Sequence, residues 1–206
     1  MTEPNTYWNH NTAYHPWILR RLGRRSRVLD VGCGEGLLLS RIAPVCDHAV
    51  GLEPDPATAA RARQRLAGLE NVEVVEAGLL YYRPTEPFDA IVFVASLHHL
   101  GLEVGIHRAL DLLAPAGILI VVGLAQNASV ADWTRSLLSI PVNKIVGWIH
   151  HEQTDIGVPV AEPDETYADL RRFVRAALPG AHWRYGVHYR YLLHWTAPHD
   201  HQPRLG

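Results

Sequence analysis

Two short and almost entirely apolar segments constrain the fold of this chain more than any other feature. Residues 88–95 read FDAIVFVA and residues 118–123 read ILIVVG. A strand without polar alternation is buried on both faces, which is typical of a parallel sheet covered by helices. Shorter apolar segments at 28–31, 49–53 and 72–75 alternate with helical segments. This alternation predicts a doubly wound α/β domain with right-handed crossovers.

The composition agrees with one folded domain. The chain has 206 residues, of which 48% are hydrophobic and 19% charged, and this balance supports a core. The formal net charge of −2 provides no overall basic field for nucleic acid or an anionic membrane. The sequence shows no signal-peptide pattern and no apolar run of transmembrane length, and it has only two cysteines. We therefore expect a cytoplasmic protein in a reducing compartment.

We expect residues 1–206 to form a single domain with two additions to the sheet. Residues 13–23 carry apolar side chains at helical spacing and end at a glycine, which predicts an N-terminal helical cap over 1–25. Residues 124–163 interrupt the alternation of strands and helices. They predict a lid-like insert with a helix over about 129–149.

The last part of the chain predicts a helix and a pair of closing strands. Residues 164–178 are amphipathic, with Asp164 as the expected N-cap. Residues 183–195 are rich in aromatic side chains and predict a hairpin that turns near Gly186. The tail after Pro198 is expected to be frayed.

Closely spaced glycines follow the first predicted strand and precede a helix, in the sequence from Asp30 to Gly36 (DVGCGEG). Glycine allows a tight turn and a close approach of a ligand to the backbone. The third glycine comes one residue earlier than in the dinucleotide fingerprint G-x-G-x-x-G. Asp30 would repel a diphosphate but suits an ammonium group, and Glu53 ends the second strand, where a carboxylate can bind both ribose hydroxyls. The set predicts a nucleoside ligand with an amino-acid end and no phosphates.

With these motifs the chain resembles the class I (Rossmann-like) S-adenosylmethionine-dependent methyltransferases of the small-molecule type. The glycine loop is similar to the first family motif and Glu53 to its ribose-binding acid. Residues 88–92 resemble the fourth-strand motif, and residues 113–117 the turn before the fifth strand. The resemblance covers about 26–123 and, more weakly, the C-terminal strands. It implies a doubly wound, mostly parallel seven-stranded sheet with helices on both faces and an antiparallel C-terminal strand pair.

The resemblance also implies a methyltransferase that uses S-adenosyl-L-methionine and releases S-adenosyl-L-homocysteine (EC 2.1.1.-). The family often has an acidic residue after the third strand that contacts adenine, but here Glu76 comes slightly early and Gly78 and Leu79 occupy that place. The adenine contact is therefore open, and backbone groups of Gly78 and Leu79 could supply it. The expected cofactor-binding residues are Asp30, Gly32, Cys33, Gly34, Gly36, Glu53, Pro54, Gly78, Leu79, Ala95 and Ser96.

Two adjacent histidines follow the fourth predicted strand, in the sequence Ser96-Leu97-His98-His99. A histidine titrates near neutrality and could accept a proton from an alcohol or phenol acceptor, whereas an amine or a thiolate needs no base. His99 and His98 are therefore the catalytic candidates. Strand-like alternation would turn one of the pair inward, and His99 is preferred. Alternatively, either side chain only packs or caps the next helix.

Aromatic side chains outside the sheet indicate where an acceptor would bind. Tyr14 and His15 in the cap, and Trp133 and Trp148 in the insert, are expected to line the closed site, unless they serve packing alone. The predicted acceptor is a small organic molecule, aromatic or lipophilic, as in specialised metabolism. The acceptor atom, the oligomeric state, and two alternatives remain open: an RNA or protein methyltransferase, and a non-catalytic cofactor-binding protein.

We expect neither a metal ion nor a nucleic-acid or membrane partner. The chain has 13 histidines, but the adjacent pairs at 98–99 and 150–151 cannot easily place both rings on one ion, and the two cysteines lack C-x-x-C spacing. Arginines between 20 and 27 form a basic cluster at a predicted hinge. Residues 95–98 lack the motif that marks many nucleic-acid amino-group methyltransferases, so we interpret the cluster as a solvated helix end.

Overall fold

The computed structural model describes residues 11–126, 165–186 and 190–205. Its strands are β1 (Arg25–Val31), β2 (Cys46–Leu52), β3 (Val72–Val75), β4 (Phe88–Val94), β5 (Leu113–Leu124), β6 (His182–Tyr185) and β7 (Arg190–Thr196). Its α-helices are α1 (His15–Leu22), α2 (Leu37–Ile42), α3 (Pro56–Arg65), α4 (Leu102–Leu112) and α6 (Tyr167–Ala177). Three short 3₁₀ helices are η1 (Thr12–Tyr14), η2 (Ala43–Val45) and η3 (Leu97–His99).

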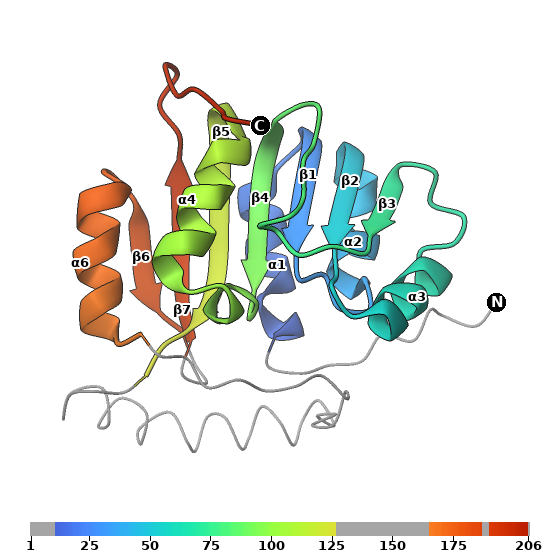
Figure 1. The fold of residues 1–206 in the computed structure, drawn as a ribbon, viewed down its shortest axis with the longest axis horizontal. Coiled ribbons are helices and arrows are strands. Elements are labelled where there is room, and N and C mark those ends of the chain that lie inside the picture. Colours follow the sequence, from blue (N-terminus) through green and yellow to red (C-terminus); the bar gives the residue numbers. More distant parts are fainter. Residues whose placement is uncertain (1–10, 127–164, 187–189, 206) are drawn as a thin grey trace.

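The strands form one seven-stranded sheet in the order β3-β2-β1-β4-β5-β7-β6, with helices on both faces (Figure 1). The pairs from β3 to β5 are parallel, whereas β7 runs antiparallel to both β5 and β6. This architecture confirms the fold that the sequence predicted, including the closing hairpin. Within the described ranges, no helix is both long and apolar enough to cross a membrane.

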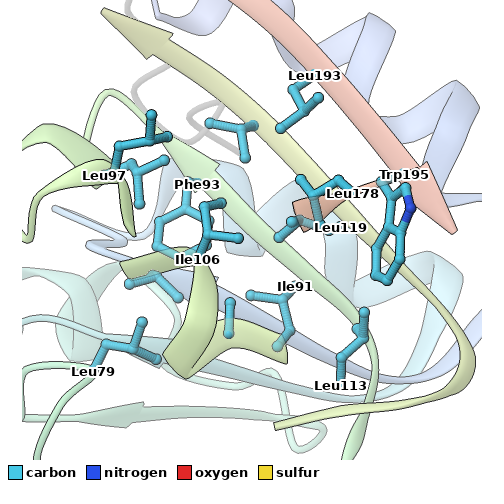
Figure 2. Close-up of a cluster of buried hydrophobic side chains, with 14 of the residues drawn as sticks. Leu79, Ile91, Phe93, Leu97, Ile106, Leu113, Leu119, Leu178, Leu193 and Trp195 are labelled. Atoms are coloured by element: carbon cyan, nitrogen blue, oxygen red, sulfur yellow. The ribbon is translucent and has the colours of Figure 1, made fainter. Parts of the chain in front are cut away.

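The apolar strands bury side chains on both faces of the sheet, as their lack of polar alternation predicted. Ile91, Phe93 and Leu119 point to one face, where they pack against α4 and α6 (Figure 2). Val92 and Ile120, their neighbours in sequence, point to the other face and pack with α1 and α2. These two cores hold the strand ends in fixed positions.

The basic segment after α1 is part of the sheet and not a hinge. Gly23 ends α1 with φ +57°, and β1 then starts at Arg25, which pairs in register with Cys46 of β2. The backbone N–H of Arg27 donates to Asp89 at 2.8 Å, and its guanidinium lies 3.1 Å from Glu86. Strand pairing and these two carboxylates therefore hold residues 25–27 in place, whereas the sequence alone showed only a cluster of charged side chains.

Two further details differ from the expectation at the C-terminal end. The N-cap of α6 is Thr166, which forms a reciprocal capping box with Asp169 and replaces the expected cap at Asp164. The tail after Pro198 is docked, because the Arg204 N–H donates to the Asp111 carbonyl at 2.6 Å and the His201 ring lies 2.8 Å from the Leu110 carbonyl. Hydrogen bonds to the end of α4 therefore hold the tail against the body.

Candidate active site

The order of the strands has its topological switch point at the carboxyl ends of β1 and β4. The chain passes from β1 outward to β2 and β3, and then returns to β4 on the other side of β1. Ligands of open α/β sheets bind at such a switch point. The glycine loop follows β1 and Ser96 follows β4, so the two sequence motifs meet here. The Ser96 hydroxyl donates to the carbonyl of Val31, the last residue of β1.

The glycine loop is tightly wound and tied to the neighbouring strand. Gly32, Gly34 and Gly36 all have positive φ angles, of 71°, 55° and 78°. The backbone N–H groups of Gly32 and Cys33 both donate to the carbonyl of Leu52, at 2.8 and 2.9 Å. A Cβ atom on Gly32 would lie 2.6 Å from the Ser96 Cβ, so this position has no room for a side chain. The close approach of the loop to the end of β4 therefore depends on glycine at this position.

Glu53 joins the end of β2 to the glycine loop. One carboxylate oxygen accepts from the Gly34 N–H at 3.1 Å, and the other accepts from the Asp55 N–H at 3.0 Å. Asp55 in turn caps α3 through the Thr58 N–H, and Pro54 between them is exposed. The carboxylate predicted to bind ribose therefore lies at the loop, and two backbone donors hold it there.

Asp30 lies beneath the loop with an unusual electrostatic environment. Its side chain is buried, and the buried oxygen Oδ2 has no hydrogen-bond partner among the described residues. Burial, together with the nearby charge of Glu53, raises the pKa of Asp30 to about 7. An unpartnered buried carboxylate is costly unless a cation neutralises it. This donor set fits the ammonium group of an amino-acid ligand and does not fit a diphosphate.

The remaining loop residues would act through their backbones. The Cys33 thiol is buried, and burial raises its pKa, so it carries no charge near neutral pH.

Leu79 is buried in the core, and the Gly78 carbonyl accepts from the Tyr81 N–H at 3.0 Å. Glu76 is exposed and lies 3.7 Å from Arg63. An adenine contact by backbone groups of residues 78 and 79 stays a prediction.

The two histidines after β4 lie in different environments. Their rings stack with centroids 4.1 Å apart, but His98 is half-buried and His99 is exposed. The sequence preference for His99 rested on strand alternation, which does not apply because residues 97–99 form the 3₁₀ helix η3. His98 is therefore the more buried of the two rings, and a catalytic role for either histidine stays a prediction.

A small cavity adjoins His98 at the carboxyl ends of β4 and β5. Its volume of about 10 Å³ is the size that holds about one water molecule. Most of its wall is apolar, and its polar side chains come from His98, Glu165 and Tyr191. Sequence analysis missed Glu165 and Tyr191. Neither belongs to a motif, because they meet only when β7 and the start of the last helix come together in space.

The cap residues are packed into the fold. Tyr14 belongs to the core beneath α1, and its hydroxyl lies so close to Gly186 that a Cβ there would be 2.8 Å away. His15 is buried and accepts from the Arg41 guanidinium at 3.0 Å. Burial and the Arg41 charge lower the pKa of His15 to about 3, which keeps the ring neutral. These contacts support the packing alternative, and Trp133 and Trp148 lie outside the described residues.

Comparisons with known proteins identify the family of this chain. Residues 28–117 match the family described as a methyltransferase domain. The chain is 31% identical over 206 residues to an uncharacterized methyltransferase of Mycobacterium tuberculosis, covering 93% of this chain and 98% of that protein. Fold, site and relatives together show that the chain belongs to the class I S-adenosylmethionine-dependent methyltransferases.

Two nodulation proteins give a more distant comparison. Nodulation protein S of Sinorhizobium fredii is 28% identical over 115 residues, which covers 54% of this chain and 53% of that protein. The crystal structure of N-methyltransferase NodS from Bradyrhizobium japonicum WM9 with S-adenosyl-L-homocysteine has a TM-score of 0.62 at 22% identity. It covers 92% of this chain and 89% of NodS, so the fold is shared over nearly the whole length of both.

Replacing Glu53 by alanine is expected to weaken binding of S-adenosyl-L-homocysteine about tenfold or more, or about 1.4 kcal/mol. The change removes charged acceptors for ligand hydroxyls and also releases the Gly34 N–H. Calorimetric titration measures the effect. Glu76→Ala is the matched control, since it removes an exposed carboxylate just after β3. Equal affinities of the two variants would remove Glu53 from the cofactor site.

Proposed function

We propose that this methyltransferase acts on a small organic acceptor with an apolar body, bound at the carboxyl ends of β4 and β5. The observation that carries the proposal is the position of His98. The ring lies two residues beyond Ser96, which touches the glycine loop, and it borders a cavity with a mostly apolar wall. A mostly apolar wall with a few polar side chains is typical of sites for small molecules.

The chemistry requires the acceptor atom to be close to and in line with the activated methyl group. The acceptor's lone pair forms the new bond to carbon while the carbon–sulfur bond breaks and its electron pair stays on sulfur. Holding the two reactants in this alignment supplies a large part of the rate. For a hydroxyl acceptor, His98 would take the released proton, whereas an amine that binds neutral would need no base before the transfer.

The location of the basic cluster favours a small acceptor over RNA. Arg20 and Arg21 lie in the last turn of α1, and Arg25 starts β1. These residues lie at the amino-terminal edge of β1, whereas the glycine loop follows its carboxyl end. A positively charged track to the methyl group would have to cross the length of the strand. The cluster and the glycine loop therefore lie at opposite ends of β1.

A labelled-methyl assay tests the proposed function. The protein is incubated with methyl-labelled S-adenosyl-L-methionine and either a panel of apolar phenols, alcohols, amines and thiols, or bulk RNA, or bulk protein. We expect label in the low-molecular-weight fraction only. Label in the RNA or protein fraction would overturn the proposal. Tight binding of S-adenosyl-L-homocysteine without transfer to any fraction would instead support a non-catalytic cofactor-binding protein.

A further inference from the structure

We propose that Glu165 is a positioning residue for His98, and that the Tyr191 hydroxyl completes a three-residue acid–base site at the carboxyl ends of β4 and β5. The inference rests on the proposed function, because it assigns the group that receives the acceptor's proton. The three side chains come from η3, from the residue pair that precedes α6, and from β7. They border one cavity whose other described lining is Leu97, Leu102, Leu124, Ala125 and Leu170.

Glu165 is fixed in place from two sides. One oxygen of its carboxylate accepts from the N–H of Leu102, the first residue of α4, at 2.7 Å. Its backbone carbonyl accepts from the Gln126 N–H at 2.9 Å, just beyond the end of β5. The N-terminus of α4 attracts negative charge, which adds to the hydrogen bond that holds this carboxylate. The side chain is only partly exposed, which limits how much water can screen its charge.

His98 presents its two ring nitrogens to different surroundings. The Nδ1 atom is buried and has no hydrogen-bond partner among the described residues. The ring as a whole is half-buried, so Nε2 lies toward the exposed side. A carboxylate that reached this nitrogen would favour the tautomer with the proton on Nδ1, which would leave the Nε2 lone pair free to act as a base. Glu165 and Tyr191 border the same cavity as His98 and are the polar side chains in its lining besides this ring.

A glycine on the neighbouring strand leaves the room that the Tyr191 ring occupies beside the cavity. Gly123 of β5 pairs in register with Tyr191 of β7, and the Tyr191 ring lies over it. A Cβ atom on Gly123 would overlap the Tyr191 ring and hydroxyl. The phenol is buried, and burial, with the charge of Glu165 adding to it, raises its pKa. Tyr191 therefore stays protonated and can donate a hydrogen bond in the cavity.

The charges around His98 have opposing effects on its basicity. Burial lowers the pKa of His98, and the neighbouring His99 and Arg190 lower it further, whereas Glu165 raises it. Among the described residues, Glu165 is the one anion that acts on this ring. When Nε2 takes the proton of a hydroxyl acceptor, the negative charge of this carboxylate stabilises the imidazolium that forms. Bond formation at the acceptor oxygen then leaves the methylated product, a neutral thioether, and one proton on His98.

The test is a histidine pKa measurement by NMR, which needs no acceptor. The imidazole signals of the full-length protein are followed from pH 4 to 9, and the His98 signal is assigned by its absence in His98→Gln. Replacing Glu165 by glutamine keeps an acceptor for the Leu102 N–H but removes the charge. We expect the pKa of His98 to fall by about half a unit or more in Glu165→Gln. Glu103→Gln, an exposed carboxylate in the first turn of α4, should leave it unchanged.

Turnover provides the second measurement, with the phenol of the panel that is methylated fastest. We expect kcat to fall about tenfold in Glu165→Gln, with little change in KM or in affinity for S-adenosyl-L-homocysteine. An unchanged pKa of His98 in Glu165→Gln would overturn the proposal even if the panel identifies an acceptor. A shifted pKa with unchanged kcat toward a phenol would also overturn it. If no panel member is methylated, the proposed function fails, and the NMR result alone then decides whether Glu165 acts on His98.

Discussion

Replacing Gly32 by alanine is expected to reduce the affinity for S-adenosyl-L-homocysteine about 100-fold or more, which corresponds to about 2.8 kcal/mol. Two effects add at this position. The residue has φ +71°, a backbone conformation that alanine adopts only with strain. The new Cβ would also lie 2.6 Å from the Ser96 Cβ, so the loop and the end of β4 would have to separate. That separation breaks the arrangement that binds the ligand.

A remote glycine provides the matched control for this experiment. Gly68 follows α3 and has φ +94°, but a Cβ there would meet no atom within 4 Å. Gly68→Ala therefore introduces backbone strain without a clash and away from the site. Calorimetry with S-adenosyl-L-homocysteine and thermal unfolding should show lost binding in Gly32→Ala only. Similar affinities in both variants would mean that the loop does not approach the ligand closely.

The second large effect is expected at Asp30. Replacing it by asparagine should weaken binding of S-adenosyl-L-homocysteine about 100-fold, because a neutral amide cannot neutralise an ammonium group. The same change should make the unliganded protein more stable at pH 8. The wild-type carboxyl titrates near 3.8 when unfolded and near 7 when folded. The folded state therefore binds more protons between these values, and the free energy of unfolding falls as the pH rises through them.

The same carboxyl predicts how ligand affinity depends on pH. A bound ammonium favours the ionised form of Asp30, so binding below pH 7 must release a proton. The affinity of the wild type for S-adenosyl-L-homocysteine should fall about tenfold from pH 7 to pH 5.5. The Asp30→Asn variant should lack this dependence, whereas Asp47→Asn, at an exposed position in β2, should retain it. A flat wild-type profile would exclude Asp30 as the ammonium ligand.

The sheet and the cofactor crevice could be predicted because their signals are local in sequence. Consecutive apolar residues such as FDAIVFVA predict a strand that is buried on both faces. The glycine spacing and Asp30 lie within one short segment, and the doubly wound fold brings Glu53 to the adjacent strand end. The helix cap at Thr166 could have been predicted as well, since the sequence T-x-x-D is a capping signature.

The acid–base cluster could not be predicted in the same way. His98, Glu165 and Tyr191 are separated by long stretches of chain and meet only through tertiary packing. Which histidine points inward depends on the 3₁₀ turn after β4, because a turn and a strand present successive side chains differently. The docked tail also depends on contacts with α4 that carry no pattern in sequence.

The bridge between Gln126 and Thr166 has a consequence for engineering. These two residues pair side by side, and the Gln126 N–H donates to the Glu165 carbonyl, so the chain just after β5 and the chain just before α6 meet at one point. An exchange of residues 127–164 for another sequence would therefore require no change in the spacing of the two junctions. Chimeras that carry another sequence in place of 127–164 can therefore keep the same two junctions on a constant sheet.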